Sequence, residues 1–297
     1  MRIGFIGAGR MGFTLGKHIT VKKPEGIIVT GYYSRNVESA KEAAEFTDTL
    51  YYEALVDLVK ESDTLFITVP DGQIAVMAEM LDGLGDVLDG KIICHTSGAL
   101  SSQVFSGMKQ PVYGYSIHPV YAVNSKTESY INFSDCFITI EGHERYLQSF
   151  VDLFASMDHE VKVIDASNKV KYHASAVFAS NLVVGLYHMA VELLVECGFN
   201  KEDAERALKP LFENNASNII NYGCNNSLTG PVARCDIDTV SKHTKVLKGE
   251  HLKVYSLLSK ELIGIARENA IKISDSGNNE EINESYDKLN ELIGRHL

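Results

Sequence analysis

A glycine-rich turn between an apolar strand and a helix is the feature that most constrains the fold of this chain. The turn follows the predicted strand 2–6 and opens a helical pattern at 11–19. Its first glycine permits a tight turn, its second lets the backbone approach a pyrophosphate, and its third lets the helix pack closely on the strand. The N–H groups at the start of that helix attract the anion. The motif predicts a dinucleotide-binding site over a merely structural turn, at Gly7, Ala8, Gly9, Arg10, Met11 and Gly12.

The end of the second predicted strand indicates which nucleotide binds. A site for NAD usually carries Asp or Glu about 20 residues after the glycines, where it grips the ribose 2′-hydroxyl. This chain has Tyr33-Ser34-Arg35-Asn36 there, without an acid. Ser34 can hydrogen-bond a 2′-phosphate and the guanidinium of Arg35 can cover it. We therefore predict NADP(H) as the cofactor, while Arg35 as an ordinary surface arginine is the alternative.

Short apolar strands alternate with helical patterns through the first half of the chain. Strands that are apolar throughout are typical of a parallel sheet with helices on both faces. The fold class expected is α/β, with an N-terminal Rossmann domain built on a doubly wound parallel sheet. The predicted strands are 2–6, 27–33, 64–69, 91–96, 112–117, 136–141 and 161–164, and the predicted helices are 11–19, one capped by Asn36, 54–60 and 74–81.

The alternation ends near residue 166, and long helical patterns follow. We predict an NADP-binding Rossmann domain at 1–166 and an all-helical domain for substrate binding and dimerisation at 167–297. The helical domain is expected to contain helices at 169–197, from Asn200 onward, at 236–247 and at 252–270, a loop at 223–231, and a polar linker at 274–280 before a last short helix.

Composition excludes several classes of partner. The chain has 28 Lys and Arg against 39 Asp and Glu, a formal charge of −11, which argues against binding nucleic acid phosphates. The five cysteines form no C-x-x-C pair and the ten histidines no H-E-x-x-H, so free thiols in a reducing cytoplasm and no metal site are expected. Residues 182–199 are the most apolar stretch but contain His188, Glu192 and Glu196. A core helix is therefore expected there, and no membrane span.

Two further turns are expected beside the nicotinamide end of the cofactor. Ligands of open parallel sheets lie beyond the carboxyl ends of the strands. Val69 and Pro70 end one predicted strand, and Ser97 follows another. Ser97 is expected either to contact nicotinamide or substrate, or to cap the segment that starts at Ala99.

Several motifs in the chain resemble those of one group of reductases. With them the chain is similar to the 6-phosphogluconate-dehydrogenase-like superfamily, which includes ketopantoate, pyrroline-5-carboxylate and β-hydroxyacid enzymes and prephenate dehydrogenases. It resembles most the Rossmann-like reductases whose C-terminal half is known as DUF2520. The motifs are His95-Thr96-Ser97-Gly98-Ala99-Leu100, Ser116-Ile117-His118-Pro119, Tyr172-His173, Ser180-Asn181 and Leu228-Thr229-Gly230-Pro231-Val232-Ala233-Arg234.

The resemblance implies an N-terminal Rossmann domain, a C-terminal helical domain and a homodimer. Some members of the group resemble an alternative type of ketopantoate reductase, which implies a role in pantothenate biosynthesis. The family usually has Gly between the Arg and the Asp that follow Thr-Gly-Pro, whereas this chain has Cys235.

Reduction of C=O leaves an oxygen that needs a proton, so a general acid is required. His118 stands at the end of a predicted strand and resembles the histidine that faces the reacting oxygen in prephenate dehydrogenases; the alternative is a histidine that holds its loop. Lys171 and His173 start the long predicted helix, where related enzymes place a catalytic Lys followed four residues later by Asn. Here Ser175 occupies that later position. A solvated Lys171 is the alternative to a catalytic one.

Two more polar residues are candidates for the site. Asn181 shares a predicted helix face with His188 and must find a partner in substrate or backbone. Arg234 can clamp a substrate carboxylate with two hydrogen bonds, or it can pair with Asp236 or Asp238 and order the loop.

The leading hypothesis is an NADPH-dependent reductase of a small 2-keto acid, with ketopantoate as the expected substrate. His118, Lys171 and His173 are the candidate proton donors, Asn181 would orient the substrate, and Ser97 and Arg234 would bind it. The alternatives are an imino-acid reductase of the pyrroline-5-carboxylate type and a non-catalytic NADP(H)-binding module.

Overall fold

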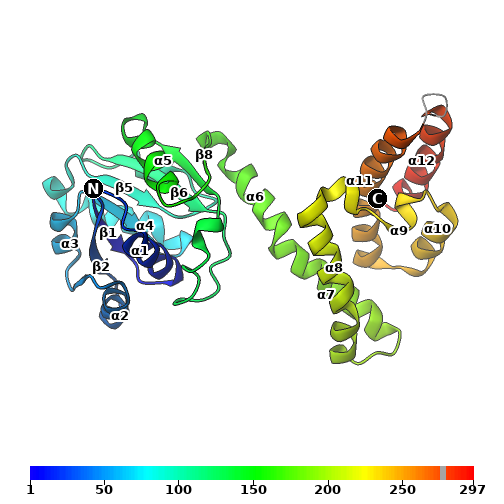
Figure 1. Ribbon diagram of the computed structural model, residues 1–297, viewed down its shortest axis with the longest axis horizontal. Coiled ribbons are helices and arrows are strands. Elements are labelled where there is room, and N and C mark those ends of the chain that lie inside the picture. The colour runs from blue at the N-terminus through cyan, green and yellow to red at the C-terminus, as the bar shows by residue number, and fades with distance from the viewer. Residues whose placement is uncertain (275–278) are drawn as a thin grey trace. The chain divides into compact units, whose positions relative to one another are not determined.

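The chain folds into two compact units, Met1–Ser180 and Asn181–Leu297. Figure 1 shows the computed structural model, which describes residues 1–274 and 279–297. The first unit includes helix α6 (Lys169–Ala179), so the boundary falls at Ser180 rather than at the predicted 166. The side chain of Lys169 anchors α6 in this unit, because it is buried there. Residues 275–278 of the predicted linker lie outside the described residues.

An eight-stranded sheet forms the centre of the first unit, in the order β3-β2-β1-β4-β5-β6-β7-β8. Strands β1 to β6 are parallel, β7 runs antiparallel to β6, and β8 runs parallel to β7. The predicted doubly wound α/β sheet is thus confirmed, with a short edge strand, β3, that the hydrophobic pattern did not predict. The strands are β1 (Arg2–Ile6), β2 (Ile28–Tyr33), β3 (Leu50–Tyr52), β4 (Thr64–Ile67), β5 (Ile92–His95), β6 (Tyr113–Pro119), β7 (Ile138–Gly142) and β8 (Val161–Val163).

Helices cover both faces of this sheet because the central strands are apolar on both sides. Every residue of β4 and β5 is buried. Phe66 packs into one core with residues of α1, α2 and α5, whereas its neighbours Leu65 and Ile67 pack into a second core with residues of α3 and α4. These helices are α1 (Arg10–Lys22), α2 (Val37–Thr47), α3 (Leu55–Glu61), α4 (Ile74–Asp82) and α5 (Leu147–Ala155).

The described residues of the second unit form helices and the turns that connect them. Its core cluster includes Val232, Val240, Ile263 and Leu289, which come from its four C-terminal helices. The helices of this unit are α7 (Asn181–Glu196), α8 (Lys201–Ser227), α9 (Gly230–Ala233), α10 (Ile237–Val246), α11 (Gly249–Ile273) and α12 (Asn279–Gly294).

Two backbone positions in this unit depart from regular helix. Gly223 has φ 76° and ψ 168°, and it interrupts α8 where the sequence predicts a loop. Cys235 has φ 52°, a left-handed conformation that normally favours Gly. The glycine that the resemblance implies at this position would adopt this conformation without strain.

Helix α7 is far more exposed than a core helix. Val191 is its one buried residue among those described, and the helix packs on α8. The expectation of a core helix at 182–199 is therefore wrong for a single copy of the chain. The helical segment Ala166–Glu196 is long and apolar enough to cross a membrane, but one such helix is weak evidence for a span.

Two histidines are buried together in the first unit. His18 of α1 and His159 approach each other at 3.0 Å between their Nε2 atoms. Nδ1 of His159 lies 3.0 Å from the carbonyl oxygen of Cys136. Burial, followed by the nearby His159 and Lys22, lowers the pKa of His18 to about 4. The neutral form of His18 is therefore the one that the fold accommodates.

We predict that acid weakens the first unit through His18. Because the pKa of His18 is lower in the folded state than its ordinary 6.5, the stabilisation is complete above pH 6.5 and is lost as the pH falls towards 4. Where unfolding takes up one proton, the free energy of unfolding changes by about 1.4 kcal/mol per pH unit. Urea unfolding followed by circular dichroism gives the free energy of unfolding at each pH between 7.5 and 4.5. This free energy should fall less steeply with falling pH in His18→Gln than in the wild type.

The exposed His188 provides the matched control. His188→Gln should keep the wild-type dependence on pH. Equal slopes for His18→Gln and the wild type would contradict the assignment.

Candidate functional site

The turn after β1 has the geometry that its glycines predict. Gly7 has φ 108°, which is strained for any other residue. A Cβ on Gly12 would lie 2.5 Å from the carbonyl oxygen of Gly7, so a side chain there would push α1 away from β1. The hydroxyl of Thr68 donates a hydrogen bond of 2.8 Å to the same carbonyl oxygen. The turn is thereby held against the end of β4.

The first turn of α1 offers its backbone N–H groups to a ligand. Gly9 caps the helix without a side-chain hydrogen bond, and the first turn holds no acidic residue. A Cβ on Gly9 would contact only one atom within 4 Å, the carbonyl oxygen of Thr68 at 3.8 Å. An anion can therefore approach the helix N-terminus closely, where the backbone dipoles favour it.

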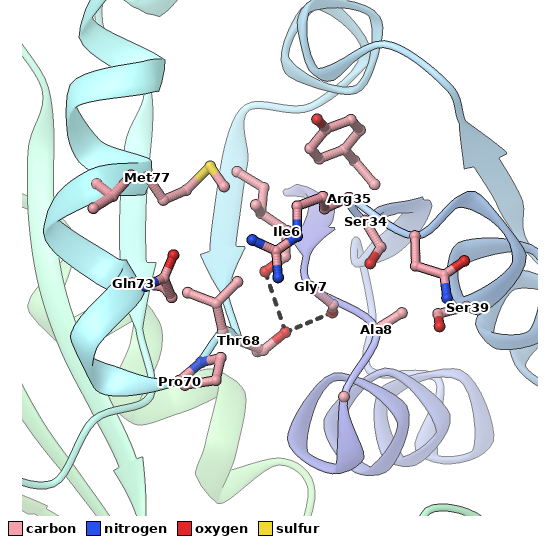
Figure 2. A pocket seen from close by; sticks show the side chains of 15 residues that line it. Ile6, Gly7, Ala8, Ser34, Arg35, Ser39, Thr68, Pro70, Gln73 and Met77 are labelled. Atoms are coloured by element: carbon pink, nitrogen blue, oxygen red, sulfur yellow. Dashed lines mark hydrogen bonds between the residues drawn. The ribbon is translucent and has the colours of Figure 1, made fainter.

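A pocket of 260 Å³ opens beside this turn, and Figure 2 shows its lining. Arg35 and Ser34 reach it from the end of β2, and no carboxylate side chain lies among the lining residues. Arg35 makes no ion pair with any residue in the described part of the chain. The lining comprises Ile6, Gly7, Ala8, Gly9, Tyr33, Ser34, Arg35, Asn36, Ser39, Thr68, Val69, Pro70, Gln73, Val76 and Met77.

Most of the predicted cofactor residues therefore line one pocket. The exceptions are Arg10, Met11 and Gly12, which begin α1 beside it. Ser39, Thr68 and Gln73 were not predicted. Ser39 could have been found from its place in the first turn of the helix that Asn36 caps. Thr68 and Gln73 carry no comparable signal, because only the fold brings their turns to the glycines.

A polar cluster lies at the ends of the neighbouring strands, joined to the pocket by Asp71. This residue stands between the lining residues Pro70 and Gln73, and its carboxylate accepts a hydrogen bond of 2.7 Å from the hydroxyl of Ser97. Ser97 in turn accepts hydrogen bonds from the N–H groups of Ala99 and Leu100, at 3.1 and 3.0 Å. Ser97 is buried, and its hydroxyl bonds are made within this cluster.

His118 and His173 meet at the same place. Nδ1 of His118, at the end of β6, lies 2.6 Å from the hydroxyl of Tyr172 on α6. The rings of His118 and His173 stand edge to face at 6.3 Å. Gly98 fits against both, since a Cβ there would lie 2.5 Å from Nδ1 of His173 and 2.9 Å from Nε2 of His118. Nδ1 of His173 is buried without a hydrogen-bond partner in the described residues.

Lys169 is the residue of this cluster that the sequence did not point to. Its side chain is 1% exposed, and Nζ has no hydrogen-bond partner in the described residues. Burial lowers the pKa of Lys169 to about 8, against the opposing effect of the carboxylates of Glu141 and Asp71. Burial, together with the positive charge of Lys169, lowers the pKa of His118 to about 3. At neutral pH the cluster thus pairs a charged lysine with a neutral histidine.

Lys169 and Lys171 lie on different faces of α6. Lys171 is exposed, whereas Lys169 is buried. His173 follows Lys169 by four residues, so the two share one face of the helix, and Lys171 does not share it. The interval of four between Lys169 and His173 is the signal in the sequence that could have placed the two side chains on one helix face.

The remaining predicted site residues belong to the second unit. Asn181 begins α7 and is exposed. Arg234 follows α9 and is also exposed, and Asp236 accepts hydrogen bonds from N and Oγ1 of Thr239. The substrate-binding roles of Asn181 and Arg234 stay predictions, as do the catalytic roles of His118, Lys171 and His173.

We predict that Arg35 selects the phosphorylated cofactor. Arg35→Asp replaces an attraction for the 2′-phosphate by a repulsion, and a lost charge-assisted hydrogen bond alone is worth about 1.5–3 kcal/mol. The Kd for NADPH should therefore rise by about tenfold or more, while the Kd for NADH should stay within about threefold. Titration calorimetry with both nucleotides measures the two values. An unchanged ratio of the two Kd values would refute the role of Arg35.

Comparison with known proteins finds two family models that match parts of the chain. Residues 2–97 match the family described as NADP oxidoreductase coenzyme F420-dependent, and residues 136–262 match the domain of unknown function DUF2520. No curated protein matches the chain.

Solved structures share the whole fold. A protein of Bacteroides fragilis is 24% identical, with 89% of this chain and 98% of that one covered and a TM-score of 0.64. A protein of Thermotoga maritima is 24% identical over 99% and 98% of the two chains, with a TM-score of 0.62. Pyrroline carboxylate reductase of Plasmodium falciparum, solved with NADP bound, is 11% identical over 98% of each chain, with a TM-score of 0.51. The chain is thus an NADP-dependent oxidoreductase of the Rossmann type that carries a DUF2520 domain.

Proposed function

We propose that the chain reduces the keto group of a small 2-keto acid with NADPH, and that ketopantoate is the first substrate to test. The observation that carries this proposal is the buried Lys169 beside His118 and His173. Reduction of a neutral C=O requires a proton at the oxygen, and a buried acid with a pKa near the working pH can deliver it. A C=N bond that already carries a positive charge depends less on a proton donor.

The residues of the pocket fit the cofactor that this reaction needs. Gly7, Gly9 and the N-terminus of α1 would hold the pyrophosphate, and Ser34 and Arg35 would hold the 2′-phosphate. NADPH supplies the hydride when bound, and the carbonyl carbon of the substrate accepts it.

The polar cluster would supply the proton. The ammonium of Lys169 would donate it to the substrate oxygen, which converts the keto acid to a 2-hydroxy acid and leaves a neutral amine that solvent reprotonates. His118 has a pKa of about 3 and stays neutral, so it would orient the oxygen through a hydrogen bond rather than transfer a proton. The catalytic proposal therefore moves from Lys171 to Lys169.

We predict that Lys169→Met abolishes most of the activity without unfolding the protein. Methionine has a similar shape and removes a buried charge, which is often neutral or stabilising. The loss of a general acid typically costs about 10²–10⁴-fold in rate. The keto-acid-dependent oxidation of NADPH should fall by that order in Lys169→Met and by less than about threefold in Lys171→Met.

The pH profile gives an independent check. Wild-type kcat should fall as the pH rises above about 8, because Lys169 then loses its proton, and Lys169→Met should lose this limb. Full activity of Lys169→Met with ketopantoate would refute Lys169 as the proton donor. Activity of both proteins with pyrroline-5-carboxylate alone would favour the imino-acid alternative, and NADPH binding without turnover of any keto or imino acid would favour a binding module.

We also propose that the protein is a cytoplasmic homodimer in which a second copy covers the apolar face of α7. Val184 is 71% exposed, and Leu182 and Leu186 are about half exposed. Residues 181–191 of α7 contain no Asp, Glu, Lys or Arg. Two copies of this uncharged apolar face can pack on each other in an isologous contact, which would bury the exposed side chains of both.

We predict that Val184→Asp dissociates this dimer. The substitution would place a carboxylate within an apolar contact, where an unpaired charge is costly. Light scattering after gel filtration should give a dimer for the wild type and a monomer for Val184→Asp. Val246 of α10 is 72% exposed, so Val246→Asp is the matched control and should remain dimeric. A monomeric wild type, or binding of the monomer to phospholipid vesicles through α7, would refute the dimer.

A further inference from the structure

The hydrogen bond between Tyr172 and His118 gives the histidine a defined orientation. The hydroxyl of Tyr172 lies 2.6 Å from Nδ1 of His118, and the two rings stand edge to face at 5.6 Å and 84°. The backbone carbonyl of His118 accepts a further hydrogen bond of 3.2 Å from the hydroxyl of Thr139 on β7. Ring and backbone of His118 are thus both held by neighbouring elements.

The length of this hydrogen bond indicates which group donates. Hydrogen bonds from N–H to oxygen are most often about 2.9–3.0 Å long, whereas those from O–H are shorter, at about 2.7–2.8 Å. A separation of 2.6 Å favours the phenol of Tyr172 as donor and Nδ1 as acceptor. Burial raises the pKa of Tyr172, which keeps the phenolic proton in place. The single proton of the neutral imidazole then resides on Nε2.

Nε2 of His118 points towards Gly98. Both histidine rings pack on this glycine, since a Cβ there would lie 2.9 Å from Nε2 of His118 and 2.5 Å from Nδ1 of His173. Nδ1 of His173 is buried without a hydrogen-bond partner in the described residues. A ring N–H and an unsatisfied ring nitrogen thus both border Gly98, and a buried polar atom without a partner is a candidate contact for a polar group of a ligand.

We propose that Tyr172 is a positioning residue that holds His118 as the Nε2–H tautomer, so that His118 donates a hydrogen bond to the oxygen of the substrate. This role rests on the proposed reduction of a keto acid. The donated hydrogen bond strengthens as negative charge develops on that oxygen. No proton leaves His118 in this step, because the proton of the product hydroxyl comes from Lys169.

A second tyrosine in the chain allows a matched experiment. The hydroxyl of Tyr255 lies 3.0 Å from Nδ1 of His243 in the second unit, and these rings stand at 5.6 Å and 85°. Tyr255→Phe therefore removes the same kind of hydrogen bond within the second unit. Tyr172→Phe keeps the aromatic ring, which lies 5.4 Å from Nζ of Lys169, and removes only the hydroxyl.

The tautomer is read from ¹⁵N shifts of histidine-labelled protein without cofactor or substrate, with His118→Gln to assign the signals. We expect a protonated Nε2 for His118 in the wild type and in Tyr255→Phe, and a mixture of tautomers in Tyr172→Phe. A protonated Nδ1 in the wild type, or an unchanged tautomer in Tyr172→Phe, would overturn the proposal. This NMR measurement tests the role of Tyr172 even if the protein reduces no keto acid.

Kinetics test the consequence for the reaction. Tyr172→Phe should lower kcat by about tenfold, the usual effect of one lost hydrogen bond. KM for NADPH and the alkaline limb assigned to Lys169 should not change, and Tyr255→Phe should retain the wild-type kcat. A changed tautomer with an unchanged kcat would overturn the positioning role. An absence of keto-acid reduction in the wild type would instead refute the proposed function.

Discussion

The close approach of α1 to the end of β1 is the constraint on which the rest of the first unit depends. It exists because Gly12 carries no side chain, since a Cβ would meet the carbonyl oxygen of Gly7 at 2.5 Å. With the helix in this position, its free N–H groups face the carboxyl edge of the sheet. The pocket, the residues after β2 and the turn after β4 all lie around that point.

Burial of charge determines the chemistry of the polar cluster. An ammonium group loses its hydration when it is buried, so its neutral form becomes easier to reach. Glu141 and Asp71 offset part of this effect for Lys169, and the same positive charge keeps His118 neutral. Two basic side chains that would both be protonated at acidic pH in water thus acquire different protonation states at neutral pH.

The sequence predicts those parts of the structure that follow from local rules. The glycine turn, the apolar strands and the absence of an acid after β2 need only short stretches of chain, and Ser34, Arg35, Val69 and Pro70 do line the pocket. Lys169 could not be chosen over Lys171 by its type, because both begin the same helix and only tertiary packing buries one of them. The pairing of His118 with Tyr172 joins positions 54 residues apart, which no local pattern reveals.

The position of Asp71 makes the two halves of the candidate site mechanically dependent on each other. Its short turn contributes Pro70 and Gln73 to the wall of the nucleotide pocket, and its carboxylate holds the hydroxyl of Ser97. Ser97 in turn restrains the two peptide groups that follow Gly98. A displacement of this wall would therefore be felt at Gly98, against which His118 and His173 pack.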